Sequence, residues 1–260
     1  MVVTSTHKAL MGYTQTATIS MSARAIDAAR LDRSVDTTAT TSPSATLLAS
    51  IDATRAVMLR DGVAAMDRAL DTASQARAML RRVDGVVVVD DSNAGVHVDP
   101  LKVTLWLPRT GLTGTAIADM LWSEGHGVES ADNDTLVMTV SVASTQSAVL
   151  GVMDKIVGYI NTHRQEARAS MPSGVWTIRP EVVMTPRAAV FAPRRRINLR
   201  DAAGEISAEQ FCPYPPGVPL LGPGERVTRE VIDAIETAGK SGRVAYCSDS
   251  TLKTIEVVAQ

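Results

Sequence analysis

A regular alternation of short apolar runs and amphipathic segments between residues 86 and 163 restricts the choice of fold more than anything else in the sequence. The runs have the length and β-branched composition of strands, and the amphipathic segments repeat apolar residues every three or four positions, as helices do. We expect strands at 86–89, 102–107, 128–131 and 135–142, helices at 114–124 and 145–163, and turns at 90–95 and 132–134. This alternation predicts a small α/β sandwich with one helical face.

The segment before this alternation predicts one strand followed by helices. The β-branched run Met1-Val2-Val3-Thr4 reads as the end of a buried strand that turns at Ser5-Thr6-His7-Lys8. Because a buried strand needs neighbours on both sides, we expect the chain to begin in the middle of a domain. A short helix is expected at 23–31, and one long helix, or two that break near Asp61-Gly62, at 44–82.

The last third of the chain has a different composition. Residues 166–174 predict a polar linker, and the prolines that follow predict a loop-rich unit whose one clear helix begins near Thr228. We therefore divide the chain into three expected domains, 1–84, 85–165 and 166–260.

Composition excludes several classes of protein. A formal charge of −2 gives no basic field for nucleic acid. The two cysteines, Cys212 and Cys247, form no C-x-x-C motif, and the histidines have no zinc-ligand spacing, so neither a disulfide framework nor a metal site is expected. No apolar run approaches the length of a membrane span, and no export signal is recognisable. We expect a soluble cytoplasmic protein.

Lys8 is the residue whose surroundings suggest chemistry. It follows a predicted buried strand and is flanked by the hydroxyl of Ser5 and the imidazole of His7. Desolvation there would lower the pKa of the amine, which favours the neutral form needed to make a Schiff base with an aldehyde cofactor. The residues alone also fit a surface lysine beside a turn histidine, which is the commoner situation.

Five sequence blocks in a fixed order decide between these readings. They are Ser5-Thr6-His7-Lys8 with Gln15, Thr40-Thr41-Ser42-Pro43 leading into Leu48-Ala49-Ser50-Ile51-Asp52, Asp99-Pro100-Leu101-Lys102-Val103-Thr104 with Gly111-Leu112-Thr113-Gly114, Thr185-Pro186-Arg187-Ala188, and 213–221 with Pro223-Gly224-Glu225. Over almost its whole length the chain resembles the C-terminal half of the fold-type-I ornithine/lysine/arginine decarboxylases, which use pyridoxal 5'-phosphate (PLP). The resemblance implies an α/β fold with three parts. These are the end of an aspartate-aminotransferase-like PLP major domain, a small α/β sandwich and a loop-rich α+β C-terminal domain.

The resemblance also implies roles for single residues. Lys8 matches the lysine that binds the cofactor covalently, and Ser5 and His7 match neighbours that contact it, His7 beside the reacting atoms. Thr40 matches a position from which a neighbouring subunit reaches the cofactor phosphate, which places the active site at a dimer interface. From the residues alone, Thr40 also fits a helix cap, and the two roles are compatible because both use a hydroxyl at a helix N-terminus.

The implied function is decarboxylation of a basic amino acid by a fragment or subunit. In this fold the acidic partner of the cofactor ring, the stacked ring clamp and the phosphate loop all precede the lysine, and only seven residues precede Lys8 here. We expect another chain, or a homo-oligomer, to supply the missing half. The alternative is a non-catalytic remnant or interaction module. A different PLP reaction, such as amino transfer, fits Lys8 but not the block at 213–221.

The sequence departs from the family pattern at two positions, and it offers two weaker candidates for functional sites. Relatives usually have Gly-Arg-Ile where this chain has Gly204-Glu205-Ile206, a charge reversal at a possible subunit or substrate contact, and Ser20 replaces a frequent histidine. The run Arg194-Arg195-Arg196 is expected to be a solvated loop more often than an anion site. Cys212 is expected to be a packed side chain and not a nucleophile.

Overall fold

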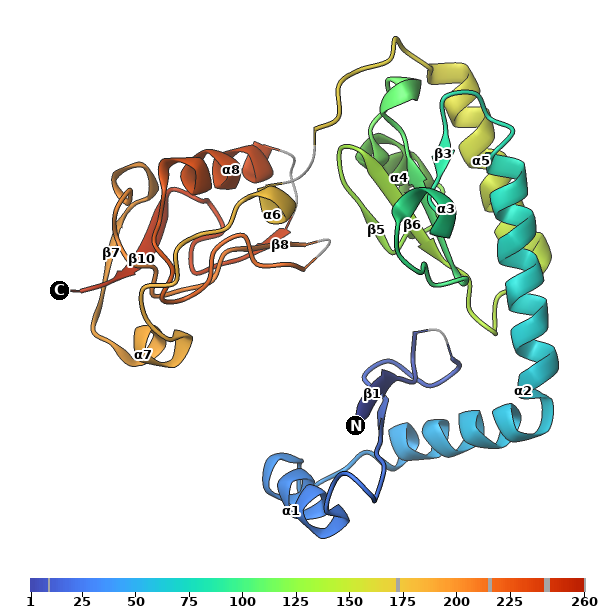
Figure 1. The fold of residues 1–260 in the computed structure, drawn as a ribbon, viewed down its shortest axis with the longest axis horizontal. Helices are drawn as coiled ribbons and strands as arrows, with labels where there is room; N and C mark the ends of the chain where they lie inside the picture. Colours follow the sequence, from blue (N-terminus) through green and yellow to red (C-terminus); the bar gives the residue numbers. More distant parts are fainter. Residues whose placement is uncertain (9, 172–173, 215–216, 241–243, 260) are drawn as a thin grey trace. The chain divides into compact units, whose positions relative to one another are not determined.

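The computed structural model describes residues 1–8, 10–171, 174–214, 217–240 and 244–259 (Figure 1). Pro172 of the predicted linker and Pro215 and Pro216 of the proline-rich block lie outside the described residues. The chain divides into two compact units. Unit 1 comprises Met1–Trp106, Ser123–His126 and Val137–Arg164, and unit 2 comprises Leu107–Trp122, Gly127–Leu136 and Gln165–Gln260.

The N-terminal part of unit 1 is a ribbon of two antiparallel strands followed by two helices. The elements are β1 (Val2–Ser5), β2 (Ala17–Ser20), α1 (Ala28–Thr38) and α2 (Ala45–Leu80). Strand β1 pairs with β2 from Val2 opposite Ser20 to Ser5 opposite Ala17. The prediction that β1 is buried is wrong, because Val2 and Val3 are 61% and 63% exposed and no other described strand pairs with the ribbon.

The helices begin later than the sequence predicted. The Asp27 side chain accepts a hydrogen bond from Ala29 N and starts α1, so the helix expected at 23–31 lies about one turn further on. The hydroxyl of Ser44, not that of Thr40, caps α2 by accepting from Leu47 N. Of the two possibilities predicted for 44–82, the structure has the single long helix, although the ribbon of α2 changes direction partway along its length (Figure 1).

A four-stranded sheet with the order β3-β4-β6-β5 forms the predicted small α/β sandwich. Its elements are β3 (Val87–Val88), α3 (Asp91–Ala94), β4 (Lys102–Trp106), α4 (Gly114–Ser123), β5 (Ser130–Ala131), β6 (Thr135–Thr139) and α5 (Gln146–His163). Residues at 90–95, expected as a turn, instead form α3, because Asp90 and Asn93 make a reciprocal capping box. Helix α2 packs against α5, and its small residues Ala69, Ala73 and Ala76 are buried.

Unit 2 includes the proline-rich C-terminal region. Its elements there are α6 (Gly174–Thr177), α7 (Pro186–Phe191), β7 (Arg194–Asn198), β8 (Cys212–Tyr214), α8 (Arg229–Lys240), β9 (Val244–Tyr246) and β10 (Thr254–Val258). Strand β7 pairs antiparallel with β10, and β8 with β9. The apolar face of α8, with Val231, Ile232 and Ile235, packs with Ile255 and Val257 of β10 in one core. None of the helices in the described parts of the chain combines the length and apolarity that crossing a bilayer requires.

The three arginines at 194–196 are exposed to solvent, as expected, but they lie in strand β7 and not in a loop. Arg194 and Arg196 each donate to the Glu256 carboxylate at 3.0 Å, and Arg195 donates to Glu205 at 2.8 Å. The hydrogen bonds from Arg194 and Arg196 lower the pKa of Glu256. Glu205, the charge reversal noted above, is therefore paired within its own chain.

Candidate functional site

Three of the residues predicted to hold a cofactor, Ser5, His7 and Lys8, lie at the end of β1 and in the connection that follows it. Thr6 N donates to Thr16 O at 3.0 Å, and Gly12 N donates to Thr6 O at 3.1 Å, so the connection folds back on itself. Tyr13 N also donates to the Ser50 hydroxyl on α2 at 3.2 Å. We call residues 5–16 the Lys8 turn.

Within the Lys8 turn, Ser5, His7 and Lys8 are near neighbours in sequence, and their joint role in a site stays a prediction. Ser5 and His7 are half-buried, and His7 Nδ1 lies 2.9 Å from the backbone oxygen of Thr16. The side chain of Lys8 is exposed. The burial expected to desolvate this amine is therefore not supplied by the described residues, because the ribbon carries no covering element.

Two further residues of the turn are notable. Thr6 is only 3% exposed, yet its Oγ1 has no hydrogen-bond partner among the described residues. Gln15 has a positive φ of 79°, a left-handed conformation that is uncommon for a residue other than glycine, asparagine or aspartate. Sequence reasoning assigned neither residue a role, since burial and backbone conformation depend on how the turn closes.

Thr40 lies between α1 and α2, and among the described residues no hydrogen bond joins it to the Lys8 turn. It is exposed, and its hydroxyl accepts from Ser42 N at 3.2 Å, a local turn that leaves α2 to be capped by Ser44. The helix-cap interpretation of Thr40 is thus wrong. Its contact with phosphate in a neighbouring subunit stays a prediction.

The Lys8 turn fits one edge of a PLP site in its donor chemistry. It offers an accessible primary amine on Lys8 for an aldehyde and a hydroxyl on Ser5 that can donate to an anionic group, with the imidazole of His7 next to Lys8 in sequence. Lys8 lines neither the cavity beside Arg77 and Asp99 in unit 1 nor the two cavities beside Asn198 in unit 2. The described part of the Lys8 turn thus offers functional groups suited to one side of such a site.

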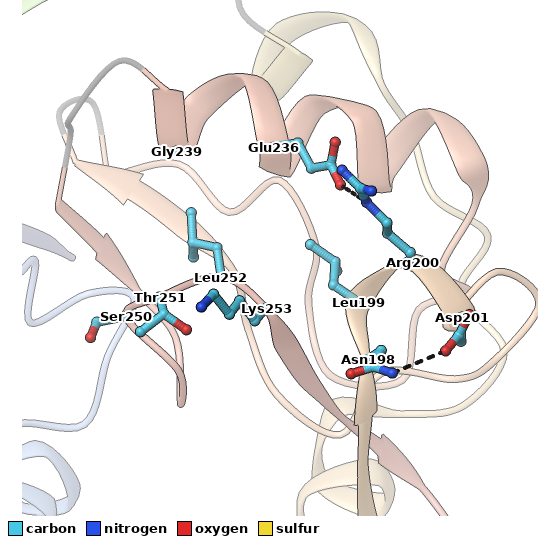
Figure 2. A pocket seen from close by; sticks show the side chains of 10 residues that line it. All are labelled: Asn198, Leu199, Arg200, Asp201, Glu236, Gly239, Ser250, Thr251, Leu252 and Lys253. Atoms are coloured by element: carbon cyan, nitrogen blue, oxygen red, sulfur yellow. Dashed lines mark hydrogen bonds and ion pairs between the residues drawn. The ribbon is translucent and has the colours of Figure 1, made fainter.

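A cavity of about 700 Å³ lies in unit 2 (Figure 2). Its ten lining residues are Asn198, Leu199, Arg200, Asp201, Glu236, Gly239, Ser250, Thr251, Leu252 and Lys253. Arg200 Nε donates to Glu236 at 2.7 Å, and the Asn198 amide donates to Asp201 at 3.3 Å. None of Ser5, His7, Lys8 and Thr40 lines this cavity.

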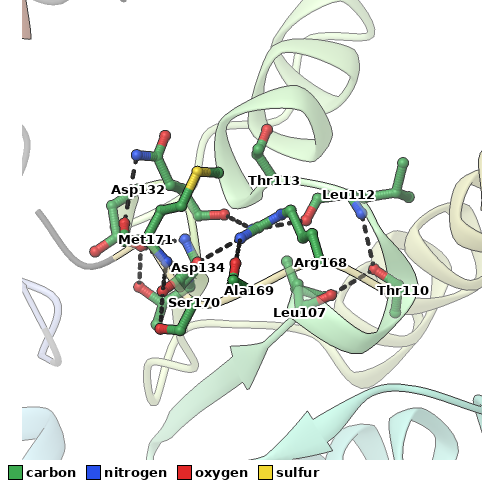
Figure 3. A network of polar contacts seen from close by, with 12 residues as sticks. Leu107, Thr110, Leu112, Thr113, Asp132, Asp134, Arg168, Ala169, Ser170 and Met171 are labelled. Carbon is green, nitrogen blue, oxygen red and sulfur yellow. Dashed lines mark hydrogen bonds and ion pairs between the residues drawn. The ribbon is translucent and has the colours of Figure 1, made fainter. Parts of the chain in front are cut away.

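Sequence reasoning missed a polar network that ties the linker to the β5–β6 turn (Figure 3). Arg168 donates to Asp134 Oδ1 at 2.7 Å and to Leu112 O at 3.0 Å, and Met171 N donates to Asp134 Oδ2 at 2.8 Å. Ser170 donates to the same carboxylate. Burial alone would raise the pKa of Asp134, but the hydrogen bonds from Ser170, Arg168 and Met171 outweigh it, so the pKa is lowered. The buried Asp134 carboxylate therefore anchors the linker through its ion pair with Arg168 and its hydrogen bonds with Ser170 and Met171.

Cys212 is buried, as predicted for a packed side chain, and its burial raises the pKa of its thiol. A raised pKa leaves less thiolate at neutral pH, which argues against a nucleophile. His97 pairs with Asp91, and His163 stacks on Tyr159.

Comparison with known proteins gives the class of the chain. Residues 1–148 match the major domain of Orn/Lys/Arg decarboxylases, and residues 169–243 match their C-terminal domain. The arginine decarboxylase of Bacillus subtilis is 29% identical over 270 residues, which cover 99% of this chain and 54% of the relative. That of Halalkalibacterium halodurans is 27% identical over 269 residues, which cover 100% of this chain and 54% of the relative.

The crystal structure of the Francisella novicida lysine decarboxylase LdcF superposes with a TM-score of 0.75 at 17% identity, covering 99% of this chain and 48% of that one. The fold is therefore the mixed α/β fold of the C-terminal half of such decarboxylases, as predicted. The chain belongs to the Orn/Lys/Arg decarboxylase family, which is PLP-dependent. It spans about half the length of the curated relatives it matches. The three domain boundaries stay predictions.

Proposed function

We propose that the chain supplies the Lys8 side of a PLP-dependent decarboxylase that acts on ornithine, lysine or arginine. The observation that carries this proposal is the Lys8 turn itself. An accessible lysine, a half-buried imidazole and a half-buried hydroxyl share one closed connection, and that connection lies within the match to the family's major domain. Fold and family membership alone would not identify which residues form the site.

In this proposal Lys8 holds the cofactor through its amine, Ser5 and His7 contact it, and Thr40 reaches the phosphate of a neighbouring subunit. When bound, PLP supplies the electron sink for loss of the carboxylate. The turn presents the amine of Lys8 outward while His7 stays anchored to Thr16 O. A basic amino acid is the substrate class.

The exposure of Lys8 also supports a proposal about the partner. Lys8 is exposed in the residues described, so the remaining walls come from a segment equivalent to the half of the relatives that this chain does not match, with the active site at a subunit interface. The alternative is a non-catalytic remnant or interaction module, which the exposure of Lys8 also favours.

Reductive trapping tests the proposal. The 260-residue chain is incubated with PLP, reduced with borohydride and mapped by mass spectrometry, alone and with the unmatched N-terminal half of the B. subtilis relative, while carbon dioxide release from each basic amino acid is followed. We expect adduct on Lys8 and carbon dioxide release only in the mixture. Lys8→Ala should abolish both, and Lys253→Ala, at an exposed lysine of unit 2, should change neither.

Two results would count against the proposal in different ways. Full activity of the chain by itself would show that no second half is needed. Unchanged amine production by Lys8→Ala in the mixture would remove Lys8 from the mechanism and leave the remnant interpretation.

A further inference from the structure

The Lys8 turn is closed by a backbone oxygen that accepts two hydrogen bonds. Thr16 O receives Thr6 N at 3.0 Å and lies 2.9 Å from His7 Nδ1. Thr16 is itself held, since its hydroxyl donates to Tyr13 O at 2.6 Å and its amide donates to the same oxygen at 3.1 Å. The oxygen that contacts His7 is therefore fixed from both sides of the turn.

The contact between His7 Nδ1 and Thr16 O shows which ring nitrogen of His7 carries the hydrogen. A carbonyl oxygen only accepts hydrogen bonds, so the ring nitrogen facing it must carry the hydrogen. A neutral imidazole has one N–H, and with that hydrogen on Nδ1 the Nε2 atom keeps a free lone pair. His7 in this state accepts a hydrogen bond at Nε2 and does not donate one.

Gly12 permits the close packing that holds this arrangement. A Cβ at Gly12 would lie 2.5 Å from Thr16 Oγ1 and 3.0 Å from Thr6 Cγ2. Thr6 and Thr16 are 3% and 2% exposed, so neither side chain has room to move away. A side chain at position 12 would therefore push Thr6 and Thr16 apart and disturb the bond to His7.

We propose that Thr16 and Gly12 are positioning residues of the Lys8 site, which fix His7 as the Nδ1–H tautomer with Nε2 as an acceptor. The role in catalysis rests on the proposed function, but the tautomer does not. Beside Lys8, an acceptor at Nε2 suits a donor such as an ammonium or hydroxyl group of a bound ligand. Donation to an anion from the same atom would first require protonation of His7.

Nitrogen NMR of the uniformly labelled full chain in alkaline buffer, where imidazole side chains are neutral, tests the assignment without cofactor. Long-range correlations from the ring carbon-bound hydrogens identify the protonated nitrogen, and His7→Gln identifies the His7 signals. We expect the Nδ1–H pattern in the unsubstituted chain. Gly12→Ala should lose it in favour of the Nε2–H form that unconstrained histidines prefer. Gly158→Ala on α5, where a Cβ meets nothing within 4 Å, should keep it.

A second variant separates positioning from loss of fold. Thr16→Ala keeps the carbonyl and removes the closest atom to a Cβ at position 12, so the double variant Gly12→Ala/Thr16→Ala should regain part of the Nδ1–H signal. An Nε2–H pattern in the unsubstituted chain, or an unchanged pattern in a folded Gly12→Ala variant, would overturn the proposal. Failure of Lys8 to trap PLP would leave the tautomer result standing.

Discussion

Thr6 shows how a single residue of the Lys8 turn departs from what its neighbours suggest. Its side chain is buried while that of Lys8 is exposed, and its Oγ1 has no partner in the described part of the chain. A buried hydroxyl without a partner costs about 1–3 kcal/mol. The grouping of Ser5, His7 and Lys8 could be read from their spacing. The burial of Thr6 could not, because it depends on Gly12 and Thr16 across the turn.

Thr6→Val should stabilise the Lys8 turn by about 1 kcal/mol, because valine has the same shape and no unpaired polar atom. Hydrogen exchange of the Gly12 and Thr16 amides, both bonded within the turn, should slow about fivefold. Thr254→Val is the matched control. The Thr254 hydroxyl donates to Asp249 at 2.6 Å, so its loss should speed exchange nearby. Faster exchange in Thr6→Val would show that the Thr6 hydroxyl has a partner in solution.

At the scale of elements, the sequence predicted most helices and strands of the α/β sandwich. It did not predict the ion pairs and hydrogen bonds that connect one segment of the chain to another. Apolar periodicity located β4, α4 and α5, because each buries one regular face. The strand at Arg194–Asn198 was missed because two of its arginines pair with Glu256 on β10, which is distant in sequence. The anchoring of the linker by Arg168 and Asp134 was missed for the same reason.

Asp134→Asn should destabilise unit 2 by about 3 kcal/mol, because it leaves the Arg168 charge without its buried partner. Asp84→Asn is the control. Asp84 also pairs with an arginine, Arg164 at 2.8 Å, but its side chain is 97% exposed, so the change should stay within about 0.5 kcal/mol. Urea unfolding at pH 7 measures both. Equal losses would show that the Asp134 pair is no stronger than a surface pair.

The Asp134 effect should depend on pH with a defined sign. The pKa of Asp134 is lower in the folded chain than in the unfolded chain, where a carboxyl of this kind titrates near about 3.9. Its ionised form therefore stabilises the fold fully above that value, and this contribution is lost as pH falls through the lower folded-state pKa. The difference between the unsubstituted chain and Asp134→Asn should shrink on acidification below about pH 4. A difference that grows there would contradict the assignment.

Over the whole chain, burial is distributed unevenly. Up to Asp61, the buried residues among those described are Thr6, Thr16 and Thr54, and none of them is hydrophobic. Sequence patterning located the helices of this region, but it could not show that their apolar faces lie open. That depends on segments packed from outside, which periodicity does not reveal.

The open apolar surface of the β1–β2 ribbon predicts association of the isolated chain. Val2, Val3 and Ile19 are exposed on a ribbon with unpaired edges, a combination that favours pairing between chains. We expect concentration-dependent oligomers by analytical ultracentrifugation, reduced when all three residues are changed to threonine. Val182→Thr, at a valine 66% exposed in unit 2, should have little effect. A monodisperse monomer at all concentrations would contradict this expectation.

The two ends of helix α2 differ in how far they are buried. Its C-terminal half, from Ala65 to Leu80, packs against α5, whereas most of its first two turns after Ser44 face solvent. A helix packed along one end opens first at the other, where only local propensity, the Ser44 cap and the hydrogen bond from Tyr13 N to the Ser50 hydroxyl resist unwinding of the first two turns. The cost of opening should rise gradually from Ser44 to Leu80. The part of the helix nearest the Lys8 turn in sequence would then be the part most easily reshaped when another polypeptide docks.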